Sequence, residues 1–151
     1  MKIRHLFDTK GFTLYFIAPE EPLTHAVELM MRYRIGSLAV MENEQLISIV
    51  TERDVMRAVH ERLGDFGTLA VHEVMAPRLV TCHADESIDD AMERMFENEL
   101  GRRVRHLPVL DGDRLMGIIS ISDIVHALLT EVRFENRLLR SYIKNWPEAE
   151  V

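Results

Sequence analysis

The strongest constraint on the fold of this chain of 151 residues is an internal repeat. Residues 36–60 align without a gap on residues 105–129, at an offset of 69 that carries Asp54 onto Asp123. One such copy has an amphipathic face that it cannot bury alone, so the two copies are expected to pack against each other around one core.

A second match lies upstream, where residues 23–30 align with residues 88–95 at an offset of 65. In both segments the apolar residues have the spacing of one helix face. The change in offset predicts a four-residue insertion in the second copy, between Met95 and Arg105 and close to Gly101.

Each copy is predicted to contain a strand, a helix, a hairpin and a second helix. The strands are expected at 12–17 and 79–82, the hairpins at 37–50 and 106–119, and the second helices from near Arg53 and near Ser122. This order predicts an α+β fold of two β-α-β-β-α repeats packed through their sheets. The expected organisation is a first repeat at 1–62, a linker at 63–70, a second repeat at 71–130 and a helical extension at 131–151.

The last helix is predicted to be long, because apolar residues continue at helical spacing through Leu138, Leu139, Tyr142 and Ile143. An exposed apolar helix end often packs on a second subunit, which would give a homodimer. It can equally fold back on its own domain, and the sequence leaves both alternatives open.

Composition narrows the class of protein. The net charge of −7 and the pI of about 5.5 disfavour a broad phosphate-binding face for nucleic acid. No apolar run approaches the roughly 18–20 residues that cross a bilayer, and the N-terminus lacks the apolar core of a secretory signal. We therefore expect a cytoplasmic protein that binds neither nucleic acid nor membrane.

Metal and catalytic motifs are not evident. Cys82 is the only cysteine, so neither an internal disulfide nor a CxxC zinc site can form, and the seven histidines show no HxxxH spacing. We expect no enzyme, because phosphate-loop, dinucleotide and Ser/His/Asp patterns are missing. The one nucleophile to test is the thiol of Cys82, which stands beside His83.

The candidate binding motif is a hydroxyl residue followed three positions later by an aspartate, at the end of each hairpin. Thr51 and Asp54 form it in the first copy, and Ser120 and Asp123 in the second. A hydroxyl that opens a helix lies beside free backbone N–H groups, where a phosphate can bind. The aspartate can accept hydrogen bonds from ribose hydroxyls, and Arg53 can add charge toward a phosphate.

The same pattern is also typical of a helix-capping box, in which the hydroxyl and the aspartate satisfy backbone N–H groups of their own helix. One copy alone favours capping. Two copies in register, each at the end of an apolar hairpin, strengthen the case for ligand binding without deciding it.

From about Ile3 to Leu129 the chain resembles a tandem cystathionine-β-synthase (CBS) domain pair, or Bateman module. The first copy carries this resemblance in IGSLAVMENEQLISIVTERDVMRAV, and the second in VHEVMAPRLVTCHADESIDDAMERM and VRHLPVLDGDRLMGIISISDIVHALL. The segments KGFTLYFIAPEEPL and RFENRLLRSYI resemble a group of stand-alone bacterial CBS-pair proteins. The resemblance implies a pseudo-two-fold fold, clefts between the copies, and pairing of such molecules into dimers.

The resemblance also implies a ligand class and its residues. Members bind AMP, ADP, ATP, S-adenosylmethionine or related adenosyl ligands as regulatory signals. The ribose-binding aspartate of the family maps to Asp54 and Asp123, and its phosphate-facing hydroxyl maps to Thr51 and Ser120. The positions that face phosphates in this subgroup map to Arg105, His106 and, more weakly, Lys10.

Three departures from the family pattern bear on the clefts. Ser48 stands where the family prefers glycine, Gly36 and Ser37 replace the Arg105–His106 type of pair, and the insertion falls beside that pair. The two clefts are therefore expected to differ. The favoured function is a regulatory adenine-nucleotide sensor that acts on a partner in trans, with a ligand-free dimerisation or scaffold module as the alternative.

Overall fold

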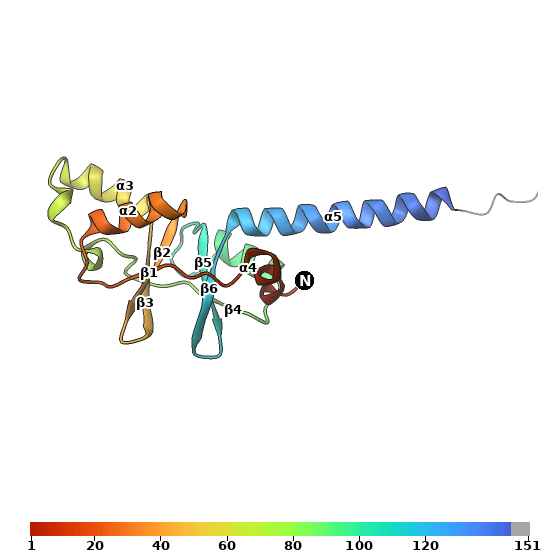
Figure 1. The fold of residues 1–151 in the computed structure, drawn as a ribbon, viewed down its shortest axis with the longest axis horizontal. Coiled ribbons are helices and arrows are strands. Elements are labelled where there is room, and N and C mark those ends of the chain that lie inside the picture. The colour runs from red at the N-terminus through yellow and green to blue at the C-terminus, as the bar shows by residue number, and fades with distance from the viewer. Residues whose placement is uncertain (146–151) are drawn as a thin grey trace, which may run out of the picture.

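The computed structural model describes residues 1–145 and shows two similar units side by side, with one long helix that projects from them (Figure 1). In chain order, residues 1–73 contain η1 (Ile3–His5), α1 (Leu6–Lys10), β1 (Phe16–Ile17), α2 (Leu23–Tyr33), β2 (Ser37–Glu42), β3 (Gln45–Thr51), α3 (Glu52–Arg62), η2 (Phe66–Thr68) and η3 (Val71–Glu73). The second unit contains β4 (Cys82–His83), α4 (Ile88–Phe96), β5 (His106–Asp111), β6 (Arg114–Ser120) and α5 (Ile121–Lys144).

The two sheets repeat one another. Each has three strands, with a short parallel strand beside an antiparallel hairpin, in the orders β1-β2-β3 and β4-β5-β6. Ser37 pairs with Thr51 in the first sheet and His106 with Ser120 in the second, which is the offset of 69 found in the sequence. The α+β fold of two repeats is thus confirmed.

Two predicted strands were too long. The first was expected at 12–17 and the second at 79–82, whereas the ladders contain only Phe16–Ile17 and Cys82–His83. These are edge strands that meet the neighbouring hairpin over two residues, so apolar character alone overstates their length. The predicted insertion lies in the nine-residue loop 97–105, whereas residues 34–36 make the matching connection in the first copy.

The segment before each repeat packs in the core of the other repeat. Ile3, Leu6 and Phe7 are buried with the second unit, and the backbone N–H groups at 3–4 donate to carbonyls at 84–86. Leu69 and Val71 are buried with the first unit, where the backbone at 71–72 bonds to residues 19–21. Because each core is completed by a segment from elsewhere in the chain, the two units are expected to fold together.

This exchange explains a difference between the hairpins. A Cβ atom on Gly117 would lie 2.5 Å from the ring of Phe7, so only glycine fits beneath that ring. The matching residue of the first copy is Ser48, which is buried and whose hydroxyl donates to the carbonyl of Ala76 at 2.6 Å. Ser48 therefore anchors the segment between the repeats, and it does not line either cleft described below.

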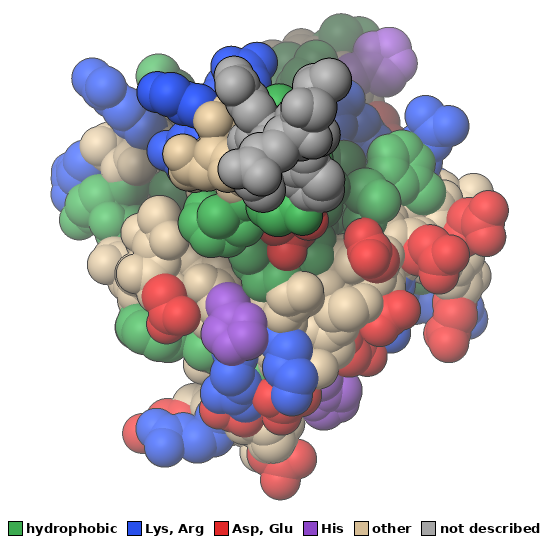
Figure 2. Space-filling view, turned by 90° about the vertical axis from the view of Figure 1, so that its right-hand side faces the viewer, with side chains coloured by type: hydrophobic (Ala, Val, Ile, Leu, Met, Phe, Trp, Pro, Cys, Tyr) green, Lys and Arg blue, Asp and Glu red, His purple; other side chains and the backbone are tan. Residues whose placement is uncertain are grey.

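The course of α5 shows whether the last helix folds back on its own domain, as far as residue 144. Its first turns pack on α1 and α4 through Ile124 and Ala127, and the helix then continues straight away from the body (Figure 1). It does not fold back. Figure 2 views the molecule from the end of α5 and shows hydrophobic side chains beside the projecting end and basic side chains gathered to one side of it. Residues 146–151 of the predicted extension lie outside the described part.

Candidate functional site

Two clefts lie between the repeats, and each contains one copy of the hydroxyl–aspartate motif. The first cleft, which spans about 800 Å³ including the part open to solvent, contains Thr51 and Asp54. The second spans about 1550 Å³ in the same sense and contains Ser120 and Asp123. Residues of both repeats line each cleft, so a ligand in either cleft would contact both repeats.

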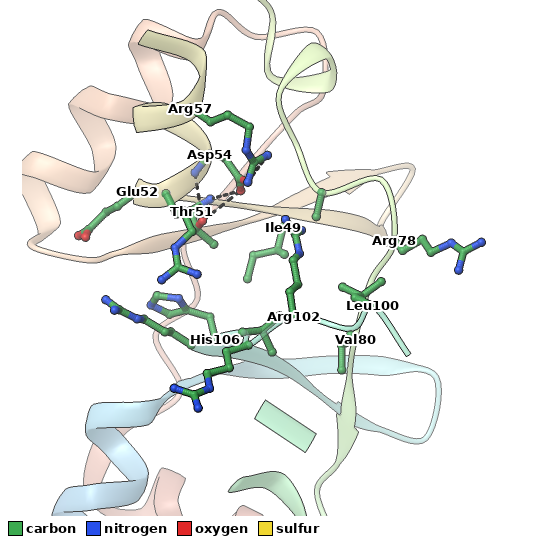
Figure 3. A pocket seen from close by; sticks show the side chains of 15 residues that line it. Ile49, Thr51, Glu52, Asp54, Arg57, Arg78, Val80, Leu100, Arg102 and His106 are labelled. Atoms are coloured by element: carbon green, nitrogen blue, oxygen red, sulfur yellow. Dashed lines mark hydrogen bonds and ion pairs between the residues drawn. The ribbon is translucent and has the colours of Figure 1, made fainter. Parts of the chain in front are cut away.

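In the first cleft, Thr51 and Asp54 form a capping box at the start of α3. The Asp54 Oδ2 atom accepts from the Thr51 backbone N–H at 2.9 Å and from its hydroxyl at 3.1 Å, and the Thr51 hydroxyl accepts from the Asp54 N–H at 3.4 Å. The Oδ1 atom lies 3.4 Å from the Arg57 guanidinium (Figure 3). The capping interpretation is confirmed. Capping uses Oδ2 of Asp54, whereas Oδ1 faces Arg57.

The first cleft is strongly basic although the chain is acidic. Its lining includes six arginines, against the two acidic residues Glu52 and Asp54; they are Arg53, Arg57, Arg78, Arg102, Arg103 and Arg105. Within residues 1–145, only Arg57 of the six forms an ion pair. Such a surplus of guanidinium groups suits an anion with several oxygens, such as a chain of phosphates.

The insertion loop brings part of this charge to the cleft. Asn98 fixes the loop by donating to the backbone carbonyls of Arg94 and Arg102, at 3.1 and 2.7 Å. The Arg103 guanidinium stacks over the ring of Phe96. In Figure 3 the side chain of Arg102 extends from this loop toward Ile49 of the first repeat, and Arg78 points away from the centre.

An apolar part of the first cleft lies next to the charges. Five nonpolar side chains contribute to the lining: Ile49, Ala76, Val80, Leu100 and Val104. An apolar wall beside a group of cations is the arrangement expected for a ligand with a flat base at one end and phosphates at the other.

The second cleft repeats the capping box but handles its charge differently. Asp123 Oδ2 accepts from the Ser120 N–H at 2.7 Å, from the Ser120 hydroxyl at 3.0 Å and from the Lys10 ammonium at 2.6 Å. Lys10 thus neutralises the aspartate that a ribose would approach. All three of these bonds use Oδ2. Among residues 1–145 no group donates to Asp123 Oδ1, which remains open as an acceptor.

Three side chains, those of Glu52, Arg105 and His106, line both clefts and form the wall between them. A Cβ atom on Gly36 would lie 3.1 Å from the Glu52 carboxylate and 3.2 Å from the His106 ring, so the missing side chain at Gly36 leaves room for both. Burial lowers the pKa of His106, and the nearby cations Lys10 and Arg105 lower it further. The carboxylates of Glu52 and Asp123 raise it, but they do not reverse the shift. The folded environment therefore favours the neutral form of His106.

A third capping box outside both clefts provides an internal comparison. Ser87 caps α4, accepting from the Asp90 N–H at 3.1 Å, while Asp90 accepts from the Ser87 N–H at 3.4 Å. Neither residue lines a cleft. The motif alone is thus a capping signal, and its position at a basic cleft is what distinguishes the other two.

The structure brings the predicted site residues to these clefts. Thr51, Arg53 and Asp54 line the first, Lys10, Ser120 and Asp123 line the second, and Arg105 and His106 line both. The residues not predicted from the sequence are Arg57, Arg78, Arg102, Arg103 and the shared Glu52. Arg57 could have been found from its position one turn after Asp54, on the same face of α3. Arg78 carried no comparable signal.

Other chemical possibilities are limited by the structure. Cys82 is fully buried, and burial raises the pKa of its thiol to about 12, so the thiolate that a nucleophile needs is not formed at neutral pH. Among residues 1–145, no three His, Cys, Asp or Glu side chains are placed to share a metal ion. Over the same residues no helix has both the length and the apolar character to cross a membrane.

Comparison with known proteins identifies the repeats. The model of the CBS domain family matches residues 12–61 and again residues 71–130. The CBS domain-containing protein CBSX3, mitochondrial, of Arabidopsis thaliana is 30% identical over 130 residues, which cover 83% of this chain and 61% of that protein. The CBS domain-containing protein YhcV of Bacillus subtilis is 28% identical over 117 residues, covering 78% and 80%.

Solved structures share the fold. The CBS-domain containing protein ATU1752 of Agrobacterium tumefaciens superposes with a TM-score of 0.77 at 31% identity, covering 84% of this chain and 98% of that one. The CBS domain pair of MJ0100, solved with 5-methylthioadenosine and S-adenosyl-L-methionine, gives 0.70 at 18%, covering 87% and 98%. CBSX2 in complex with AMP gives 0.64 at 23%, covering 78% and 89%.

Proposed function

The chain belongs to the CBS domain family, and from this premise we propose that it is a cytoplasmic regulatory module that binds an adenine nucleotide between its two repeats. The observation that carries the proposal is the first cleft, where the Thr51–Asp54 motif, an apolar wall and five arginines that pair with no carboxylate of residues 1–145 meet. Two more distant structures of the same fold hold adenosyl ligands, which supports this ligand class.

Each part of the first cleft has a counterpart in such a ligand. Asp54 Oδ1 would accept from ribose hydroxyls, and the Thr51 hydroxyl at the start of α3 would approach a phosphate. The base would lie against the apolar wall near Ile49. Arg53, with Arg105 from the second repeat, would surround the phosphates.

The charge of the cleft ranks the candidate ligands. Six arginines against two carboxylates favour a ligand with more than one phosphate, so we expect ADP and ATP to bind more tightly than AMP. S-adenosylmethionine carries a positive sulfonium and is expected to bind least well there. The second cleft is lined by only two arginines, Arg34 and Arg105, and Lys10 is already paired with Asp123, so we expect phosphates to bind more weakly there.

Regulation would follow from the position of the clefts between the repeats. A nucleotide that touches both repeats favours the relative orientation to which it binds best, and the shift is limited by its difference in affinity for the two orientations. We propose that a partner protein in trans senses this orientation and that the module acts as a homodimer.

A thermal-shift panel tests the ligand class. The purified chain would be heated with AMP, ADP, ATP, NAD, S-adenosylmethionine or no ligand. A ligand at about 100 times its dissociation constant stabilises the folded state by roughly 2.7 kcal/mol, which is easily seen. We expect the largest shift with ATP or ADP, and no shift with any of these at millimolar concentration would contradict the proposal.

A second candidate function is a dimerisation module whose clefts stay empty. It is favoured by one observation, the row of exposed apolar side chains on the projecting part of α5. Dimerisation that is independent of nucleotide, together with silent Asp54→Asn and Asp123→Asn variants, would support it over the sensor.

A further inference from the structure

The projecting part of α5 has an apolar row that nothing in the described chain covers. Val132, Leu139 and Ile143 are exposed by 52%, 59% and 71%, on a helix that has already left the body. The family model ends at residue 130, so this part of the helix is not explained by the CBS fold. An exposed apolar row of this kind marks an interaction surface.

The spacing of this row is that of a coiled coil. Leu129, Val132, Asn136, Leu139 and Ile143 follow one another at intervals of three, four, three and four residues, and we call this row the seam. Intervals of three and four are the heptad pattern, with Val132 and Leu139 at d positions and Leu129, Asn136 and Ile143 at a positions. A single asparagine at an a position typically fixes the register and favours a two-stranded coil.

The flanking charges select the partner and its direction. Glu135 occupies a g position and Arg140 the following e position, so in a parallel pair Glu135 of each helix faces Arg140 of the other. In an antiparallel pair the e positions face each other, which would bring Arg133 and Arg140 of the two helices together. None of these three charges forms an ion pair within residues 1–145.

We propose that the seam of α5 joins two copies of this chain as a parallel, two-stranded coiled coil. The proposal deepens the homodimer that is part of the proposed function, and it does not depend on nucleotide binding. The asparagine within the seam argues for a second protein helix over a membrane surface, because a lipid-facing row gains nothing from a polar residue at that position.

Single cysteines test the arrangement directly, because the native Cys82 is buried and does not interfere. In a parallel coil a d-position residue faces its own copy across the two-fold axis. We expect Leu139→Cys to form disulfide-linked dimers on mild oxidation. The matched control Ser141→Cys, on the opposite side of the same helix, should remain monomeric on a non-reducing gel. Equal cross-linking of both variants, or of neither, would overturn the proposal.

Charge reversal tests the direction of the helices independently of oxidation. Arg140→Glu places like charges across the interface and should weaken the dimer at least about tenfold by analytical ultracentrifugation. The double variant Glu135→Arg/Arg140→Glu should recover it. A wild-type dimer that ignores both changes would refute the coiled coil but keep the homodimer. A wild-type monomer at tens of micromolar would refute both, as would a monomer that instead sediments with anionic vesicles.

Discussion

At the scale of single residues, Asp54 and Asp123 each use one carboxylate oxygen to cap their own helix. Asp54 Oδ2 bonds to Thr51, and Asp123 Oδ2 bonds to both Ser120 and Lys10. A ligand would approach the other oxygen in each case, which for Asp54 also faces the Arg57 guanidinium. A substitution at either aspartate therefore changes stability and affinity together, and a test of binding needs a control that changes stability alone.

The capping hydroxyls offer such a pair. Thr51→Ala and Ser87→Ala each remove a capping box, and each should lower the free energy of unfolding by about 1 kcal/mol in urea titrations. Only Thr51 lies in a cleft, so only Thr51→Ala should also weaken nucleotide binding. Equal nucleotide affinity in both variants would show that the motif is a cap and nothing more.

Gly117 tests the close packing of the N-terminal segment on the second repeat. A Cβ atom there would meet the Phe7 ring at 2.5 Å, so Gly117→Ala should cost about 1–3 kcal/mol in the free energy of unfolding. Gly67→Ala is the control, because no atom lies within 4 Å of its added Cβ. The smaller ring-free side chain of Phe7→Leu should recover part of the loss in the double variant. A neutral Gly117→Ala would contradict this packing.

The lowered pKa of His106 predicts that the stability of the fold depends on pH. Burial lowers its pKa in the folded chain below the ordinary value of about 6.5. The unfolded chain then binds the proton more tightly, so the contribution of His106 to stability is complete above about pH 6.5 and is lost as the pH falls below it. His106→Gln should remove this part of the dependence in thermal unfolding between pH 7.5 and 5.5, and an unchanged profile would be inconsistent with a lowered pKa of this half-buried imidazole.

At the scale of elements, the insertion loop 97–105 distinguishes the first cleft from the second. It supplies Arg102 and Arg103 to a cleft that already holds arginines from α3. Its place was predicted from the change in offset between the two matches, because a gap in a repeat is visible without any structure. Its effect was not, since the direction of a loop depends on contacts such as those of Asn98, which no periodicity encodes.

The loop leads to a prediction about phosphate number. Arg102→Ala should weaken ATP binding several-fold more than AMP binding, because a longer phosphate chain engages more of the guanidinium groups. Arg137→Ala removes the same charge from the exposed part of α5 and should change neither affinity. Calorimetric titration with both nucleotides measures this difference, and equal losses for ATP and AMP would place Arg102 away from the outer phosphates.

Local sequence patterns predicted some helices and strands better than others. The hairpins and helices were predicted closely, because alternation and helical spacing over many residues are strong signals. The edge strands were overextended, since the two residues that pair are decided by the neighbouring hairpin. For α5 the sequence predicted the apolar stripe but could not decide whether it folds back, because that depends on the direction in which the helix leaves the body.

At the scale of the whole molecule, the sequence predicted two similar repeats but not how their leading segments are exchanged. Ile3 and Val71 occupy matching places in the repeat, yet each is buried in the core of the other copy. Both segments are apolar, and the close fit of Phe7 on Gly117 appears only in the structure, so the hydrophobic pattern alone could not assign them. The same exchange places Lys10 beside Asp123, which makes the second cleft unlike the first.

We propose that the first cleft binds an adenine nucleotide through Asp54 and its surrounding arginines. The decisive experiment is a calorimetric titration of ATP into the wild type, Asp54→Asn and Asp90→Asn. Both variants keep an oxygen that can accept the capping bond, but Asp90 lies in no cleft. We predict saturable binding that Asp54→Asn weakens at least about tenfold, in line with the loss of a charged hydrogen bond, and that Asp90→Asn leaves unchanged. Equal affinity in all three proteins, or no binding to the wild type, would contradict the account.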